Sequence, residues 1–140
     1  MTNSHAVQAS SANTEVDRVR RSTAAELNQE IDRQTDANIL HYANASPEVI
    51  AERVEQLDKE WDVERLLEVN ASTLALTGLA LAARGSKKWL VLPGMVLSFL
   101  LQHGVQGWCP PLPLLRRLGT RTRGEIDREK YALLAGLKGR

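Results

Sequence analysis

Residues 66–108 read LLEVNASTLALTGLALAARGSKKWLVLPGMVLSFLLQHGVQGW, and this stretch decides the fold. It holds two apolar runs that are separated by a short basic link. Glu68 is the only ionisable residue in the first run, and His103 is the only one in the second. Gly85, a residue type that commonly stops helices, lies in the link. The pattern predicts two helices that are joined by about five residues (84–88) and pack as an antiparallel hairpin.

A stripe of small residues predicts where these two helices meet. Ala71, Ala75, Gly78 and Ala82 recur at spacings of 4, 3 and 4, which places them on one face of the first helix. Small side chains let a second helix approach closely. We therefore expect this stripe to form the helix–helix seam.

The lengths of the two runs suit a lipid bilayer. Eighteen residues at 1.5 Å per residue span about 27 Å, against a hydrocarbon thickness of about 30 Å. Because the core of a soluble protein would satisfy the same length, the tryptophans help to decide. Trp61, Trp89 and Trp108 all lie at the ends of the runs, where indoles anchor at the level of the lipid headgroups. This placement favours a transmembrane hairpin at residues 64–108.

Charge is divided between the two ends of the chain. Residues 1–60 carry 6 Lys and Arg against 11 Asp and Glu, whereas residues 114–140 carry 8 against 3. Three basic residues lie in the link, and six lie beside the outer ends of the hairpin: Lys59, Arg65, Arg116, Arg117, Arg121 and Arg123. The positive-inside rule then predicts that both termini are cytoplasmic.

The segment before the hairpin is expected to lie outside the membrane. Residues 1–14 have neither the basic start nor the apolar core of a signal peptide, and we expect a disordered tail there. Residues 15–63 have the pattern of a cytoplasmic helical region. A thin apolar stripe over 15–44 indicates one helix, either amphipathic and dependent on a partner or simply solvated. Ser46 and Pro47 suit the start of another helix. That helix has Ile50, Val54, Leu57 and Trp61 on one face, and its pattern allows it to continue into the first apolar run.

Residues 109–140 have the pattern of a proline-rich exit followed by a basic amphipathic helix. Thr122 and Glu125 have the spacing of a capping box, which predicts the start of that helix. Two placements suit its charge and its apolar face. It lies on an anionic cytoplasmic leaflet or packs on the acidic N-terminal region, and the two placements are compatible.

The tetrad Gly107, Trp108, Cys109 and Pro110, placed just after an apolar helix pair, resembles a known family. It is similar to the YgaP-like inner-membrane transmembrane domain, a small bacterial two-helix module of unknown function. The resemblance covers about residues 58–135. It implies a bacterial inner-membrane protein that self-associates through its hairpin. Some relatives also carry a rhodanese sulfurtransferase domain, which this sequence lacks, so that activity does not carry over.

Cys109 is the only cysteine, which excludes an intramolecular disulfide. As a candidate reactive thiol it would need a lowered pKa. The simpler interpretation is structural. Gly107 ends the second helix, Cys109 fills a small buried gap, and the prolines at 110, 111 and 113 keep the helix from continuing. The second and third of these prolines go beyond the usual pattern of the family.

These patterns predict an all-α fold, an antiparallel transmembrane helical hairpin with flanking amphipathic helices. The sequence offers no Gly-rich phosphate loop, no Ser/His/Asp arrangement and no cluster of metal ligands. Its basic C-terminus lacks the interleaved aromatic residues of a nucleic-acid site. We therefore expect no catalysis, cofactor, metal or nucleic acid.

The expected function is a bacterial inner-membrane anchor or interaction protein. Its partners would be the lipid bilayer, further copies of the chain in a homo-oligomer, and an unidentified cytoplasmic protein. Two alternatives stay open. One is a redox or sulfur-handling accessory protein that uses Cys109, and the other is a soluble helical adaptor whose hairpin is its core.

Overall fold

The computed structural model describes residues 17–139, and every regular element in that range is a helix. In chain order these are α2 (Arg18–Arg21), α3 (Ala25–Tyr42), α4 (Pro47–Lys59), α5 (Val63–Ala83), the 3-10 helix η1 (Lys87–Leu90), α6 (Val91–Gln106), α7 (Leu112–Arg117) and α8 (Arg123–Lys138). The predicted all-helical class with two long apolar helices is confirmed. The tail expected at residues 1–14 lies outside the described residues.

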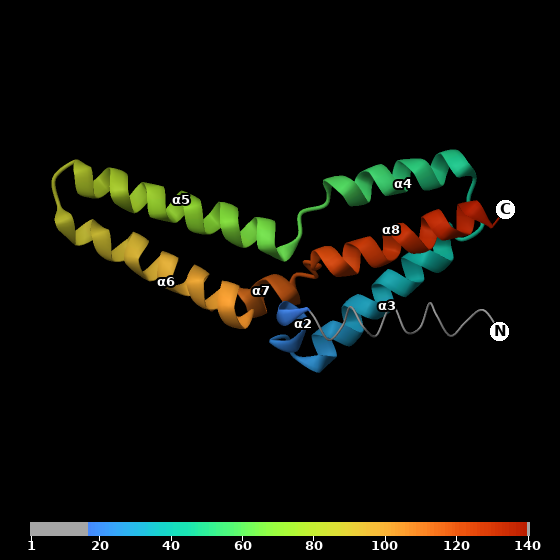
Figure 1. Ribbon diagram of the computed structural model, residues 1–140, viewed down its shortest axis with the longest axis horizontal. Helices are drawn as coiled ribbons and strands as arrows, with labels where there is room; N and C mark the ends of the chain where they lie inside the picture. The colour runs from blue at the N-terminus through green and yellow to red at the C-terminus, as the bar shows by residue number, and fades with distance from the viewer. Residues whose placement is uncertain (1–16, 140) are drawn as a thin grey trace.

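The helices form two parts along the long axis of the molecule (Figure 1). α5 and α6 lie side by side, run in opposite directions and project as an arm, with η1 between them at its tip. At the other end α8 packs against α3 and α4, and we call these three helices the bundle. α2 and α7 lie where the arm meets the bundle. Below, α5, η1 and α6 are the hairpin, and its end beside α2 and α7 is the base.

α8 packs on the N-terminal region, which is one of the two placements that its sequence allows. An apolar cluster of Ile50, Leu57, Ile126 and Leu133 joins α4 to α8. The capping box at the start of α8 is formed. Thr122 accepts the backbone N–H of Glu125, and the Glu125 carboxylate accepts the backbone N–H of Thr122 at 2.8 Å.

Buried ion pairs also join the base to the bundle. Arg116 of α7 is 1% exposed, and its guanidinium contacts the two carboxylate oxygens of Glu125 at 2.7 and 2.8 Å. It also donates to the Thr120 carbonyl at 3.0 Å and to the Asn28 side chain at 2.8 Å. Arg20 contacts the same Glu125 carboxylate. Burial raises the pKa of Glu125, but the hydrogen bonds and charge of Arg116 outweigh it, so this pKa lies below its usual range.

A second buried carboxylate, Glu129, links α8 to α4. Glu129 is 0% exposed, and it accepts hydrogen bonds from Arg53 at 2.8 Å and from Arg121 at 2.5 Å. Arg121 also donates to Glu60 at 2.8 Å. Arg121 and Arg116 are therefore inside the protein and not on a basic surface that faces lipid. These two arginines are therefore not available to bind an anionic leaflet.

The single helix predicted over residues 15–44 is broken between α2 and α3. Polar side chains bind the carbonyl groups at the end of α2. Thr23 donates to the Val19 carbonyl at 2.7 Å, and Asn28 donates to the Arg20 carbonyl at 2.9 Å. Such side-chain hydrogen bonds compete with continued helix, which explains the break.

A second break separates α4 from α5, where the sequence allows a continuous helix. Glu60 is extended, with φ −63° and ψ 135°. Asp62 caps α5 by accepting the backbone N–H of Arg65 at 2.8 Å, and the backbone N–H of Val63 donates to the Arg121 carbonyl at 3.0 Å. Because these partners satisfy N–H groups that a new helix leaves free, the chain can turn here from the bundle into the hairpin.

Gly107 ends α6 in the left-handed conformation, with φ +79°. α2 crosses this end so closely that a Cβ on Gly107 would lie 2.5 Å from the Arg18 carbonyl oxygen. Side chains of α2 and the residue after it bind the last carbonyls of α6. Arg18 donates to Gly104, and Ser22 donates to Gln106 at 3.1 Å. The crossing fixes α2 to the base of the hairpin.

We expect Gly107→Ala to lower the free energy of unfolding by about 2–3 kcal/mol. About 1 kcal/mol comes from the left-handed backbone, and the rest comes from overlap with the Arg18 backbone. The matched control is Gly119→Ala, because Gly119 has φ +83° but open space where its Cβ would lie. Urea titration followed by circular dichroism in mild detergent measures both losses. Equal losses would contradict the close crossing of α2.

Candidate functional site

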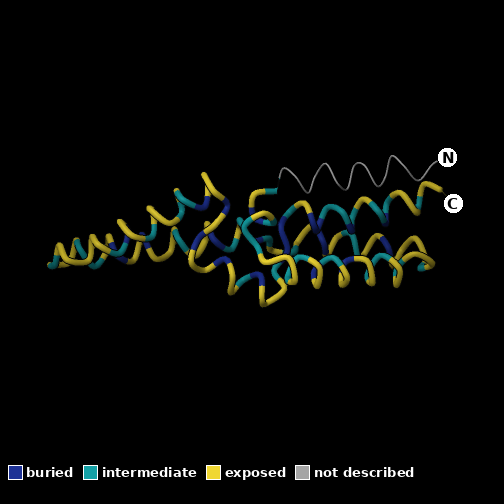
Figure 2. The backbone as a smooth tube through the Cα atoms, turned by 90° about the horizontal axis from the view of Figure 1, so that it is seen from below, coloured by how far each residue is buried: buried dark blue, intermediate teal, exposed yellow. Residues whose placement is uncertain are grey.

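The hairpin exposes large apolar side chains along its length. They are Val69, Leu74, Leu76 and Leu79 on α5, and Trp89, Leu90, Val91, Met95, Leu97, Phe99, Leu101 and Val105 on η1 and α6. Figure 2 shows the arm as mostly exposed, whereas buried residues collect in the bundle and at the base. Monomeric soluble proteins rarely expose a contiguous apolar surface of this kind, so something is expected to cover it.

Two stretches, Pro47–Ala83 (α4 and α5 with the break between them) and Lys87–Gln106, each contain an 18-residue window that is apolar enough to cross a membrane by length and composition. The core helices of soluble proteins pass the same test, but those helices are mostly buried. Here only 22% and 11% of the apolar windows are buried inside the protein. Packing within the chain therefore does not account for their apolar character.

Three exposed hydroxyl groups on the hairpin, those of Thr73, Thr77 and Ser98, are satisfied within their own helices. Thr77 donates to the Thr73 carbonyl at 2.7 Å, and Ser98 donates to the Gly94 carbonyl at 2.7 Å. Such bonds to the preceding turn need no water. The polar atoms of these exposed side chains are therefore compatible with an environment that offers no hydrogen-bond partners.

The three tryptophans lie at the two ends of the hairpin. Trp61 precedes α5 and Trp108 follows α6, so both lie at the base, while Trp89 lies in η1 at the tip. All three indoles are exposed. Arg65 stacks over the Trp61 ring, with its guanidinium carbon 4.5 Å from the ring centroid. This places an amphipathic ring at each level where a bilayer-sized hairpin would meet lipid headgroups.

The small-residue stripe faces the second helix inside the hairpin. Ala75 and Gly78 are buried, and Ala71 and Ala82 are half-buried. A Cβ on Gly78 would lie 2.5 Å from Cδ of Pro93 in α6. The close approach of α5 and α6 therefore depends on the absence of a side chain at this position.

We expect Gly78→Leu to lower the stability of the hairpin by about 2–3 kcal/mol, because the rigid Pro93 ring has to move aside. Gly94→Leu is the control, since Gly94 is exposed on α6 and has open space around its Cβ position. Thermal unfolding in detergent micelles compares the two variants. Unchanged melting of Gly78→Leu would show that the two helices do not meet at this seam.

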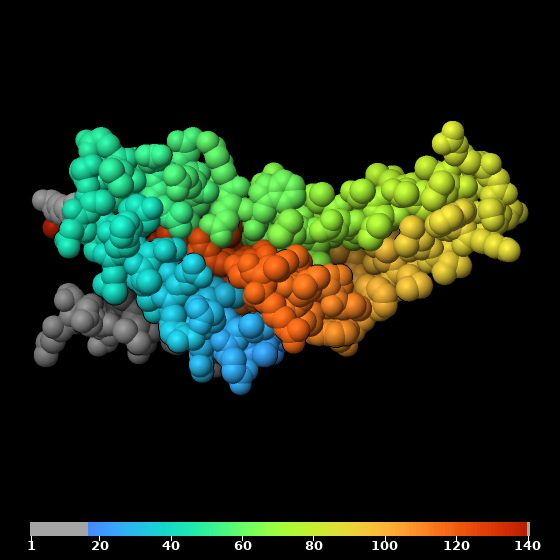
Figure 3. All heavy atoms as spheres, turned by 180° about the vertical axis from the view of Figure 1, so that it is seen from behind, coloured from blue at the N-terminus to red at the C-terminus, as the bar shows by residue number. Residues whose placement is uncertain are grey.

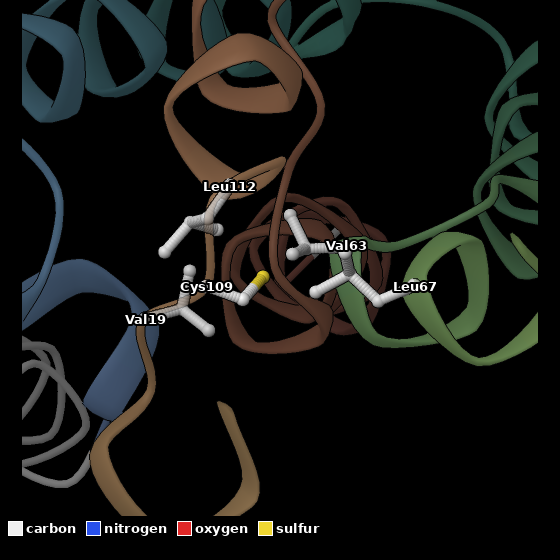
Figure 4. Close-up of a cluster of buried hydrophobic side chains, with 5 residues drawn as sticks. All are labelled: Val19, Val63, Leu67, Cys109 and Leu112. Atoms are coloured by element: carbon white, nitrogen blue, oxygen red, sulfur yellow. The ribbon is translucent and has the colours of Figure 1, made fainter. Parts of the chain in front are cut away.

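Cys109 lies in an apolar cluster at the base, with Val19, Val63, Leu67 and Leu112 around it (Figure 4). Its Sγ points toward Val63 (Figure 4). Burial raises the pKa of the Cys109 thiol, whereas a reactive thiol would need a lowered one. The cysteine thus joins α2, α5 and α7 as a small apolar side chain.

The rest of the tetrad surrounds this cluster at the start of α7. Trp108 and Pro110 are exposed, and the Cys109 carbonyl accepts the backbone N–H of Leu112 at 3.1 Å. α7 then lies on the surface of the base, beside α6 and α2 (Figure 3). Its Leu114 and Leu118 are exposed. The base therefore continues the exposed apolar surface of the hairpin.

A cleft of about 440 Å³ opens at the base, where α2, α5, α6 and the start of α8 meet. Its lining includes Glu64, Glu68 and His103 from the hairpin, together with Arg18 and Arg123. His103 is only 8% exposed. Among the described residues, its Nδ1 and the Oε2 of Glu64 are buried atoms without a hydrogen-bond partner. Unpaired buried polar atoms are rare and indicate a missing partner.

Sequence reasoning did not bring these cleft residues together. Glu64 and Glu68 share a face of α5 by their spacing of four, which is a detectable signal. His103 and Arg123 come from other helices, and no local pattern connects them. Within residues 17–139 no group of three His, Cys, Asp or Glu is placed so that it could hold a metal ion.

Comparisons of the chain with protein-family models, with curated proteins and with solved structures find no match.

Proposed function

We propose that this chain is an integral protein of a bacterial inner membrane, anchored by its hairpin and without catalysis of its own. The exposed apolar surface of α5 and α6 carries the proposal. A bilayer would cover that surface, and the hydroxyl groups of Thr73, Thr77 and Ser98 on it already have partners. The indoles at the base and the tip would lie at the two headgroup levels.

The bundle would be the part that meets other molecules. Because the base joins the bundle to the ends of α5 and α6, the bundle and both flanks of the hairpin lie on one side of the membrane in this arrangement. The basic residues on those flanks outnumber the three in the link, which favours the cytoplasmic side. The bundle would then be a cytoplasmic interaction module for an unidentified protein.

Self-association through the hairpin is part of the proposal, and the seam limits how it occurs. Ala75 and Gly78 are already covered by α6. A second copy would therefore pack on other faces of the hairpin, where Leu76 and Leu101 are exposed. Crosslinking in native membranes through single cysteines at these two positions, in a Cys109→Ser background, would test this contact.

The decisive test is extraction of membranes from expressing cells with alkaline carbonate, followed by mild detergent. An integral hairpin resists carbonate and is released only by detergent. Release by carbonate would overturn the proposal and favour the soluble adaptor. The redox alternative is not supported by the geometry of Cys109, because its thiol is buried and has a raised pKa.

A further inference from the structure

We propose that the cleft at the base binds a primary ammonium group, with the phosphoethanolamine headgroup of a phospholipid as its source. The choice of a lipid source rests on the proposed membrane function, whereas the choice of an ammonium group rests on the cleft itself.

The carboxylates of the cleft are short of positive charge. Among the described residues, neither Glu64 nor Glu68 forms a salt bridge, although Glu64 is half-buried and its Oε2 is fully buried. The two arginines of the lining are engaged elsewhere. Arg18 donates to the Gly104 carbonyl, and Arg123 pairs with Asp127 at 3.0 Å. An unpaired carboxylate that is partly removed from water is stabilised by a cation that enters the cleft.

The nature of the unpaired atoms selects the kind of cation. The Glu64 Oε2 atom needs a hydrogen-bond donor, and the Nδ1 atom of His103 in a neutral ring accepts or donates according to its tautomer. No three acidic, His or Cys side chains of the described chain converge as metal ligands. A primary ammonium group supplies both the positive charge and N–H donors. It therefore fits the cleft better than a bare ion.

The shape and depth of the cleft fit a headgroup. Its volume of about 440 Å³ lies within the usual range for small-molecule sites, about 300–1,000 Å³. Glu64 is the second residue of α5 and His103 lies in the last turn of α6, so the cleft is at the level of the indoles of the base. Leu67 and Leu100 line it toward the hairpin, where an acyl chain would continue.

The test compares ethanolamine and choline headgroups, since choline keeps the charge and the phosphate but has no N–H donor. The full chain is placed in phosphatidylcholine nanodiscs with or without phosphatidylethanolamine, and thermal unfolding is measured. We expect phosphatidylethanolamine to raise the melting temperature by about 4 °C. Glu64→Gln should abolish this shift. Glu55→Gln should retain it, because Glu55 is exposed on α4 and pairs with Lys59.

A second arm separates the two parts of the inference. Detergent-solubilised protein is titrated with glycerophosphoethanolamine or with glycerophosphocholine. One supporting result is that glycerophosphoethanolamine stabilises the parent, glycerophosphocholine does not, and neither compound stabilises Glu64→Gln. This result supports the ammonium site even where the nanodisc arm shows no shift. The lipid source would then be wrong, whereas the membrane proposal is decided separately by the carbonate extraction. Equal responses to both headgroups in both arms, or an unchanged response of Glu64→Gln, would overturn the ammonium site.

Discussion

Glu125→Ala is expected to lower the free energy of unfolding by about 3–5 kcal/mol. The substitution removes the carboxylate that neutralises Arg116, whose side chain is 0% exposed. Arg116 would keep its bonds to the Thr120 carbonyl and to Asn28 but would have no counter-charge. A buried charge left without its partner is among the most destabilising changes that a single substitution causes. Urea titration of the detergent-solubilised protein measures the loss.

Two further variants separate this explanation from a general effect of removing a glutamate. Glu55→Ala breaks an exposed pair with Lys59 and should cost less than about 1 kcal/mol. The double variant Arg116→Met with Glu125→Leu removes both charges and should recover part of the loss, because an apolar pair of similar volume often replaces a buried ion pair at little cost. The rest of the loss stays, since the backbone N–H of Thr122 no longer has the Glu125 carboxylate as its acceptor. Arg20 would keep its contact with Asp32 at 2.8 Å. A double variant as unstable as Glu125→Ala would contradict the explanation.

The hairpin is the part of the fold that the sequence predicts well. Two runs of nearly uncharged residues with a glycine in the link suffice for two helices, and the small residues identify the seam face. These signals are local, since each depends on residues within a few turns of one another. The capping signals at Ser46 and Thr122 are local as well, and both caps are formed.

The core of the bundle could not be predicted in the same way. Glu125 meets Arg20 across 105 positions of sequence, and Arg53 meets Glu129 across 76. A charged residue in a helix usually faces water, so the pattern assigns these side chains to the surface. Their burial is stable only because opposite charges are paired in space, and no spacing rule in the sequence predicts that pairing. For this reason the arginines before α8 form a basic cluster in the sequence, but two of them, Arg116 and Arg121, lie inside the protein.

The two helix breaks are less predictable than the hairpin and more predictable than the core of the bundle. Asp is a preferred residue at the start of a helix, so Asp62 is a sequence signal for a new helix. The apolar pattern around it nevertheless allows a continuous helix. The break after α2 depends on Thr23 and Asn28, which are common in helices too. The cleft at the base depends on both breaks, because they place α2 and the start of α8 beside the hairpin. The local sequence pattern therefore does not predict that the residues of the cleft lie together.

Leu97→Lys is expected to weaken membrane integration by about 3–4 kcal/mol, which corresponds to more than a hundredfold in the equilibrium. Leu97 is 52% exposed and lies near the middle of the span from Trp89 to Trp108. A lysine there would face the centre of the hydrocarbon layer, too deep for its side chain to reach water easily. Carbonate extraction measures the fraction that stays integral, and we expect that fraction to fall sharply.

Leu40→Lys is the matched control for this effect. Leu40 is 74% exposed on α3 in the bundle, so it is at least as exposed as Leu97 but would lie in the cytoplasm. In water, exposed substitutions of this kind usually change stability by less than about 0.5 kcal/mol. The fraction that stays integral should therefore differ between the two variants only if α6 lies in lipid and α3 lies in water. If both variants stay integral, or if Leu97→Lys yields a folded helical protein that needs no detergent, the surface of α6 faces water and the hairpin is not a membrane anchor.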